Sequence, residues 1–279
     1  CPPIPPKDEP WMEHDTKSRT AMKSFISFSG GVESRAMAIM FGNKADGIFA
    51  DTGWEHPELY DALDKVEAKV REFHDNDFRI IRVQQKDAEG TGETTLQGYI
   101  AAAKFYPSFK SRFCTRLFKI EPIDDYLKNF KEEGAEIMIG LNADEGDKRT
   151  GNHGLLPFVR YSYPLYDAGV NRAMCLAMLK AAGIEPNFPP HMKRGGCVGC
   201  YFKSKAEYHA MAVLDPDRYD EVADLEQTIQ DRRDKFFHVV SSIPNLRDFK
   251  RHAQSMMFDP SEIYATVNDA TNCGVFCNR

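Results

Sequence analysis

A glycine turn between an apolar strand and a helix constrains this chain more than any other feature. Residues 25–28 are mostly apolar and β-favouring, Ser29-Gly30-Gly31 turns the chain, and residues 33–41 have a helical pattern. Two adjacent glycines let the backbone approach a ligand closely and direct several N–H groups one way. The following helix adds its positive N-terminal end at the same place. The stretch predicts a cradle for phosphate or pyrophosphate, with an ordinary tight turn as the alternative.

Strand and helix patterns then alternate along the chain, as a parallel sheet requires. The predicted elements are strands at 47–50, 78–83, 137–140 and 163–165 and helices at 57–74 and 120–131. The helix at 57–74 is amphipathic, and its apolar face consists of Leu59, Leu63, Val66, Val70 and Phe73. The order of these elements predicts a doubly wound parallel α/β domain.

A polar triplet, Asp51-Thr52-Gly53, directly follows the second predicted strand. Open α/β sheets bind ligands at the carboxyl ends of their strands, so we expect this triplet to face the same ligand as the glycine turn. Asp51 is a candidate acceptor for a ribose or adenine donor. The alternative interpretation is a plain Asp-Thr-Gly turn.

The fourth predicted strand ends at Gly140 and leads into a charged segment that contains Asp144, Glu145 and Arg149. Carboxylate oxygens suit Mg²⁺ on a triphosphate, so either acidic residue is a candidate ligand. Arg149 is a candidate for neutralising phosphate charge. A solvated acidic loop is the competing interpretation.

Residues 96–120 contain no Asp or Glu, although the chain has a net charge of −6. Aromatic residues alternate there with cations, namely Lys104, Lys110, Arg112, Arg116 and Lys119. Such a segment suits a polyphosphate, a sulfated nucleotide or a nucleic-acid backbone, and a solvated basic face is the alternative. Cys114 lies at its centre, where neighbouring cations lower a thiol pKa and favour the thiolate.

Seven cysteines in a chain without a signal-peptide pattern predict metal ligands or reactive thiols rather than disulfides. Cys197 and Cys200 have the spacing to reach one metal ion from a glycine-rich loop, and the tail adds Cys273 and Cys277. These four cysteines are one candidate set, for a structural Zn²⁺ ion. In the other set Cys114 joins Cys197, Cys200 and one tail cysteine around a [4Fe–4S] cluster. Free thiols are the third alternative.

Length and composition limit the number of domains and the kinds of partner. At 279 residues and 42% hydrophobic residues, the chain suits one large domain or a domain with an appendage. Its acidic balance argues against a surface coated in basic charge. No apolar run reaches the roughly 18 residues of a membrane span, so we expect no membrane partner and a cytoplasmic location.

Three segments follow from these patterns. Residues 1–22 are expected to form a proline-rich extended arm or to be a non-native remnant, and residues 23–185 a nucleotide-binding α/β domain. Residues 186–279 combine the cysteine loop with a helical C-terminal subdomain, whose predicted helices lie at 205–214, 215–233, 245–257 and 260–269. Cys175 has apolar neighbours and is expected to be a packed thiol.

Several motifs resemble those of a known superfamily. The SGGVES loop is similar to the SGGxDS loop of the PP-loop ATPases, or adenine nucleotide alpha-hydrolases, with Glu33 where that family has Asp. ADTGWEHPELY is similar to the DTG segment of phosphoadenosine phosphosulfate (PAPS) reductases and their relatives. The segment with Cys114, Lys119 and Pro122 resembles one in the reductase and sulfur-transfer branches. Thr115 stands where assimilatory adenylylsulfate reductases have a second cysteine.

The resemblance continues, in the family order, to about residue 204. The segment after the fourth strand is similar to the family pattern G-x-R-x-x-E-x-x-x-R, with Asn142 in place of the first arginine. Adenylylsulfate reductases and DNA-phosphorothioation sulfur-transfer ATPases both pair a mid-chain cysteine with a later CxxC. The resemblance therefore favours a [4Fe–4S] cluster over zinc, with the ligand set Cys114, Cys197, Cys200 and Cys273.

The function implied by the resemblance is ATP-dependent sulfur transfer. Such an enzyme cleaves ATP to AMP and pyrophosphate, with Mg²⁺, and passes sulfur to an adenylylated acceptor, which we expect to be a nucleic acid. Catalytic roles are implied for Cys114, Lys119 and Glu33. The implied nucleotide-binding residues are Ser29, Gly30, Gly31, Glu33, Ser34, Asp51, Thr52, Gly53, Gly140 and Arg149.

Two other functions remain open at this stage. One is a PAPS or adenylylsulfate reductase, although the tail lacks the carboxyl-terminal cysteine motif of those reductases. The other is a non-catalytic nucleotide-binding subunit, which the replacements at Glu33 and Asn142 allow. The sulfur donor is not indicated by the sequence, and a homodimer is one alternative for the oligomeric state.

Overall fold

The structure is a computed structural model that describes residues 22–145, 156–186, 188–189, 191–192, 195–232, 237–240 and 242–255. Several predictions lie outside these residues: the extended arm, Arg149, the two tail cysteines Cys273 and Cys277, and the helix at 260–269. Within the described residues, no helix is both long enough and apolar enough to cross a membrane.

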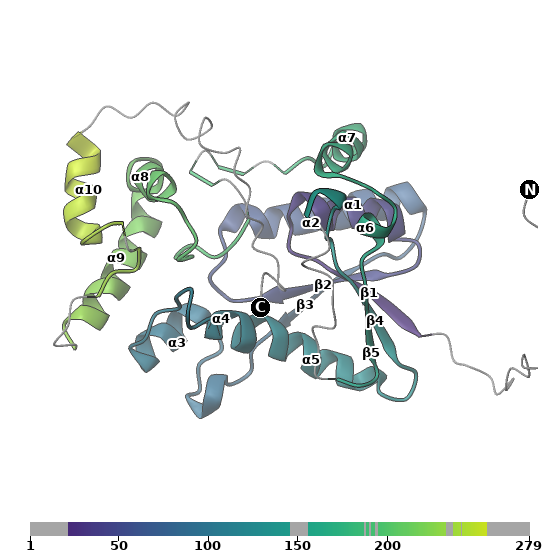
Figure 1. The fold of residues 1–279 in the computed structure, drawn as a ribbon, viewed down its shortest axis with the longest axis horizontal. Helices are drawn as coiled ribbons and strands as arrows, with labels where there is room; N and C mark the ends of the chain where they lie inside the picture. The colour runs from purple at the N-terminus through teal and green to yellow at the C-terminus, as the bar shows by residue number, and fades with distance from the viewer. Residues whose placement is uncertain are drawn as a thin grey trace, which may run out of the picture.

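A five-stranded parallel sheet forms the centre of the N-terminal part (Figure 1). Its strands are β1 (Lys23–Ser27), β2 (Asp46–Asp51), β3 (Ile80–Gln84), β4 (Ala135–Met138) and β5 (Val159–Ser162), in the order β3-β2-β1-β4-β5. The chain leaves β1 toward β2 on one side and returns to β4 on the other. The end of β1 is therefore the topological switch point, where open α/β sheets bind ligands. The predicted fold class is confirmed.

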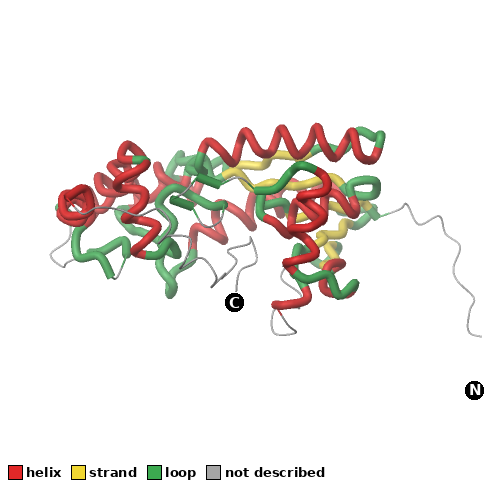
Figure 2. Tube along the Cα trace, turned by 90° about the horizontal axis from the view of Figure 1, so that it is seen from above, coloured by secondary structure: helices red, strands yellow, loops and turns green. Residues whose placement is uncertain are grey.

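Helices cover both faces of the sheet, as the view in Figure 2 shows. One face packs against α1 (Val32–Phe41), α2 (Pro57–His74), α6 (Pro164–Asp167) and α7 (Arg172–Ala182). The other face packs against a continuous helical stretch made of α4 (Phe113–Thr115), a π-helical turn η2 (Arg116–Ile120), α5 (Glu121–Leu127) and η3 (Lys128–Phe130). Alternate strand residues serve the two layers, so Ile26 joins the first core and Phe25 the second.

The helices of the C-terminal region share a hydrophobic core with earlier segments, which contribute Trp54, Tyr106 and Phe118 among others. In this core α8 (Lys205–Leu214), α9 (Pro216–Gln230) and α10 (Leu246–Ser255) pack with α3 (Leu96–Ala103) at one end of the molecule (Figure 1). Buried Glu226 holds this region together, because its carboxylate accepts hydrogen bonds from the backbone of Val239 (3.1 Å) and Leu246 (2.7 Å). The predicted helical C-terminal region is confirmed as far as the structure describes it.

Two local predictions were wrong. Residues 163–165 were expected to form an edge strand, but the strand ends at Ser162 and Pro164 begins α6. Proline has no N–H for a strand ladder and suits the first turn of a helix, which explains the change. Phe73 was expected to face the sheet, yet it is 59% exposed because α2 extends beyond the core after Val70.

Short 3-10 turns connect the remaining segments. They are η1 (Ala88–Gly90), before α3, and η4 (Ala143–Glu145), after β4. The latter occupies the start of the predicted charged segment and places Asp144 and Glu145 near the carboxyl end of β4. Cys175 is buried on α7 without a disulfide, as expected for a packed thiol.

Candidate functional site

The phosphate loop (residues 29–34) connects β1 to α1 at the switch point of the sheet. Gly30 has φ +73°, a left-handed conformation that favours glycine, and a Cβ there would lie 2.2 Å from Leu59 Cδ1. Gly31 is the N-cap of α1, and the Ser34 hydroxyl donates to its carbonyl at 3.2 Å. The loop therefore presents its backbone at the positive end of a ten-residue helix.

Arg35 stabilises the conformation of this loop by hydrogen bonds to backbone carbonyls. This role was not predicted from the sequence. The buried Arg35 guanidinium donates to the Gly30 carbonyl at 2.9 Å and to the Ile184 and Glu185 carbonyls at 3.0 and 3.1 Å. Burial lowers the pKa of Arg35 to about 10, which leaves the side chain charged at neutral pH. With the Gly30 carbonyl engaged behind the loop, the loop's N–H groups are left to face a ligand.

Glu33 does not extend freely into the site. Its carboxylate accepts hydrogen bonds from the Asn142 side chain at 3.1 Å and from Arg172 on α7 at 2.5 Å. Gly140 allows this approach, because a Cβ there would lie 3.2 Å from the Glu33 Cβ. The two positions that depart from the family pattern, 33 and 142, thus contact each other, and Arg172 supplies a guanidinium beside them.

The Asp51-Thr52-Gly53 triplet forms a tight turn after β2. Asp51 accepts hydrogen bonds from the Gly53 amide at 2.8 Å and from the Tyr60 hydroxyl at 2.7 Å. Burial and this carboxylate raise the pKa of Tyr60, so the phenol stays protonated and donates. Gly53 has φ +67°, and a Cβ there would lie 2.6 Å from Thr95. Asp51 keeps further lone pairs, but two donors already hold it in place.

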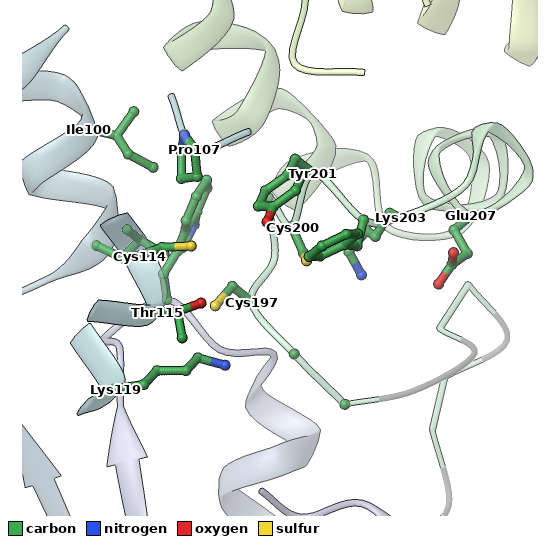
Figure 3. A pocket seen from close by; sticks show the side chains of 16 residues that line it. Ile100, Pro107, Cys114, Thr115, Lys119, Cys197, Cys200, Tyr201, Lys203 and Glu207 are labelled. Carbon is green, nitrogen blue, oxygen red and sulfur yellow. The ribbon is translucent and has the colours of Figure 1, made fainter. Parts of the chain in front are cut away.

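Three cysteines line one pocket, which we call the thiol pocket (Figure 3). Cys114 comes from α4, and Cys197 and Cys200 come from the loop before α8. In Figure 3 the Cys114 and Cys197 sulfurs face each other across the pocket, with Thr115 and Lys119 beside them. The structure therefore brings together residues more than eighty positions apart in the sequence.

The loop with Cys197 and Cys200 is positioned by the segment after β2. Glu55 and Cys197 form an isolated antiparallel bridge, and the Val198 amide donates to the Trp54 carbonyl at 2.8 Å. Gly199 permits the close packing, because a Cβ there would lie 2.1 Å from the Trp54 ring. Such dense packing defines the direction in which the thiols point.

The thiol pocket adjoins the phosphate loop. A Cβ on Gly195, which lines the pocket, would lie 3.6 Å from the Ser29 carbonyl oxygen. Cys197 is also tied to the triplet after β2, since its sulfur lies 3.4 Å from the Thr52 hydroxyl. The two predicted centres are therefore neighbours at the carboxyl edge of the sheet.

Glu55, which sequence reasoning also missed, is the proton partner of Cys197. The thiol donates to its carboxylate at 3.4 Å, and the Thr52 hydroxyl donates to the same oxygen at 3.0 Å. Burial raises the pKa of both Glu55 and Cys197, while the charge of Lys119 lowers both. The other carboxylate oxygen, Oε2, is buried without a hydrogen-bond partner among the described residues. This pair can take up or release a proton when Cys197 changes its bonding.

The basic aromatic segment 96–120 divides into two parts. Arg116 faces outward and pairs with Glu89 and Glu121, as a solvated face does. Lys119 instead lines the thiol pocket. Tyr106 and Phe118 belong to the helical core, whereas Phe109 is 78% exposed. The segment is therefore partly structural and partly a wall of the pocket.

Three of the predicted cysteine ligands line one pocket. Cys114, Cys197 and Cys200 lie around one pocket and are free of disulfides, and thiolates are the ligands of both zinc and iron–sulfur clusters. The fourth predicted ligand, Cys273, and its competitor Cys277 lie outside the described residues, as does Arg149. The choice between the two predicted cysteine sets is therefore still a prediction.

Comparison with known proteins identifies one family for the N-terminal part of the chain. Residues 23–154 match the family described as phosphoadenosine phosphosulfate reductase domain, which confirms the resemblance over that part of the chain. A comparison with curated proteins found no significant match. A solved structure with a similar fold is phosphoadenylyl-sulfate (PAPS) reductase from Candida auris in a phosphate complex. It has 16% sequence identity, with 60% of this chain and 76% of that chain covered and a TM-score of 0.42.

Proposed function

We propose that this chain, which carries a PAPS reductase domain over residues 23–154, is an ATP-dependent sulfur-transfer enzyme that adenylylates its acceptor. The observation that carries the proposal is the contact between the two centres. Gly195 of the thiol pocket lies beside the phosphate loop, since a Cβ added to it would be 3.6 Å from the Ser29 carbonyl oxygen. A nucleotide on the loop would place its reacting phosphate beside the thiols, so that activation and sulfur delivery take place in one site.

The phosphate loop would hold the outer two phosphates of ATP. Backbone N–H groups at the start of α1 stabilise the charge that grows on pyrophosphate as it leaves. An oxygen of the acceptor attacks the α-phosphorus, the bond to pyrophosphate breaks, and an adenylylated acceptor forms. A nucleophilic sulfur then displaces AMP from the acceptor. Arg35 takes no part in bonding to substrate but keeps the loop in shape.

A Mg²⁺ ion bound near the carboxyl end of β4 would neutralise part of the negative charge of the phosphates. Asp144 and Glu145 are the candidate Mg²⁺ ligands, although each already accepts a backbone hydrogen bond, from Arg172 at 3.1 Å and from Asn142 at 3.2 Å. A carboxylate has about four lone-pair sites, so one that accepts a hydrogen bond can also bind a hydrated Mg²⁺ ion. When bound, the ion would shield the phosphate charge that the acceptor oxygen approaches.

The thiol pocket would bind the sulfur that is transferred to the acceptor. Cys114, Cys197 and Cys200 would hold an iron–sulfur cluster together with a tail cysteine, and the cluster would supply a site where sulfur binds near the nucleotide. Cys197 must lose its proton to act as a thiolate, and Glu55 is the acceptor within contact. Lys119 lowers the pKa of Cys197 by its charge and so favours that thiolate. The acceptor is a nucleic acid in this proposal.

Pyrophosphate release from ATP, in the presence of transfer RNA or DNA, tests the proposal. Gly30→Ala and Gly90→Ala form a matched pair, since both glycines have nearly the same left-handed φ (+73° and +72°) but only Gly30 would meet another side chain. We expect Gly30→Ala to lower ATP-dependent pyrophosphate release at least about tenfold and Gly90→Ala to leave it unchanged. Circular dichroism shows whether both variants fold. Full activity in folded Gly30→Ala would refute the role of the loop.

A PAPS or adenylylsulfate reductase is the second candidate, because the matched family domain is named for that activity. It predicts sulfite release from the sulfated nucleotide with a dithiol reductant, and no pyrophosphate release from ATP. ATP binding without either product would instead favour a nucleotide-binding subunit. Both assays use the same purified chain, so their results separate the three alternatives directly.

A further inference from the structure

Two buried histidines and one partly buried aspartate form a cluster outside the lining of the thiol pocket, which it adjoins through Lys203. His56 is the N-cap of α2, His191 lies in the loop that leads to Cys197, and Asp215 lies between α8 and α9. One ring nitrogen of each histidine and one carboxylate oxygen of the aspartate lie within 4.8 Å of one another. The cluster thus joins the start of α2 to the junction of α8 and α9.

The two histidines are buried, and three of their four ring nitrogens have no hydrogen-bond partner among the described residues. His56 is 0% and His191 4% exposed. Nε2 of His56 contacts Lys203, and Nε2 of His191 lies near the Asp215 carboxylate. Buried polar groups in native proteins are normally hydrogen-bonded, so these imidazoles beside a carboxylate indicate a site for a ligand.

The cluster offers the donor types that transition metals bind, two imidazoles and a carboxylate. Neutral imidazoles keep a lone pair on one ring nitrogen, which is the donor that transition metals use. Asp215 adds an anionic oxygen whose Oδ2 lies 3.4 Å from His191 Nε2.

Two cations border the cluster and limit what it can hold. Lys203 Nζ lies 3.3 Å from His56 Nε2, whereas Nδ1 of His56 has no hydrogen-bond partner among the described residues. Arg218 contacts both carboxylate oxygens of Asp215, at 3.1 and 3.4 Å. A carboxylate has lone pairs for both an arginine and a metal, and such outer partners commonly orient metal ligands.

We propose that His56, His191 and Asp215 bind a divalent transition-metal ion, for which Zn²⁺ is the best match in donor type. Two imidazole nitrogens and a carboxylate oxygen form a known zinc donor set, and here one such atom from each residue lies within 4.8 Å of the others. The ion would connect α2, the loop with His191 and the α8–α9 junction. It would thereby tie the C-terminal helices to the phosphate-loop side of the sheet, independently of whether the thiol pocket holds a cluster.

Zinc binding to the full-length protein tests the site, with X-ray absorption to count nitrogen, oxygen and sulfur ligands. We expect one zinc equivalent with nitrogen and oxygen ligands alone, separable from any sulfur-bound metal in the thiol pocket. His191→Ala should weaken this site at least tenfold and abolish the zinc-dependent rise in Tm. His74→Ala is the control, because His74 lies at the opposite end of α2 from His56 and bonds the Ile39 carbonyl.

A lysine variant separates metal binding from a purely structural network. Lys203→Met removes the positive charge nearest His56, so we expect zinc to bind at least severalfold more tightly. If zinc in the wild type is entirely sulfur-bound, the site does not exist. The proposal also fails if His191→Ala, folded in the presence of a chelator, still binds zinc through nitrogen and oxygen with unchanged affinity.

Discussion

The phosphate loop and the thiol pocket meet at the same edge of the sheet, but they are built in different ways. The loop is contiguous, and one short stretch carries its strand, its glycines and its helix. The pocket is lined by residues from distant segments: Cys114 lies on α4, and Cys197 lies in a loop that packs against the segment after β2. A contiguous site depends on backbone conformation, whereas a gathered site depends on packing between distant segments.

The largest loss of stability should come from removing Arg35, which holds the phosphate loop in its conformation. Arg35→Ala deletes a buried charge and leaves three carbonyls without their donor. We expect a loss of about 4 kcal/mol in the free energy of unfolding, since hydrogen bonds to charged groups contribute about 1.5–3 kcal/mol each and are not additive. Urea denaturation of the wild type and the variant measures this difference in the free energy of unfolding. Arg160→Ala is the control, because its exposed pair with Glu136 should contribute under about 1 kcal/mol.

The next effect concerns the packing of the thiol pocket. In Gly199→Ala the new methyl group would overlap Trp54 and the Tyr106 hydroxyl, at 2.1 and 2.3 Å. We expect a loss of roughly 3 kcal/mol, at the upper end for overpacking, together with reduced metal content. The control is Gly31→Ala, where the nearest atom would lie at an ordinary 3.4 Å. Equal stability of the two variants would mean that the pocket is more adaptable than its packing indicates.

A smaller energetic effect is expected for the interaction between Glu33 at the phosphate loop and Arg172 on α7. Glu33 and Arg172 form a partly buried ion pair, with Asn142 as a third partner. A double-mutant cycle of Glu33→Gln and Arg172→Ala should give a coupling free energy of about 1.5 kcal/mol. The same cycle on pyrophosphate release shows whether the pair also supports activity. A coupling near zero would mean that the two side chains act independently.

The last prediction concerns thiol reactivity rather than stability. Burial raises the pKa of Cys197 well above its ordinary value, and the charge of Glu55 raises it further. Because only the thiolate reacts, Cys197 should alkylate about tenfold more slowly than half-buried Cys200 from pH 7 to pH 9. Glu55→Gln removes the carboxylate charge, so Cys197 should then react faster. Mass spectrometry of peptides after iodoacetamide treatment measures both rates, and faster reaction at Cys197 in the wild type would contradict the burial argument.

The sequence by itself determined the order of strands and helices and the position of the phosphate loop. Periodicity and glycine placement act over a few residues, so the strand, turn and helix around residues 29–34 can be inferred without knowing what packs on them. The sequence-based prediction of burial failed where packing against distant residues decides whether a side chain is buried. Phe73 fits the apolar stripe of α2, yet the core ends one turn earlier.

Only the tertiary structure decided which side chains act together. The Cys197 sulfur meets Glu55 across 142 positions, and Glu33 meets Arg172 across 139. His56 and His191 are similarly distant in the chain, and their sequence context shows no metal-ligand spacing. Such contacts follow from the strand order and from how the C-terminal helices dock. These depend on burial summed over the whole molecule, because no local pattern encodes which distant surfaces exclude water from each other.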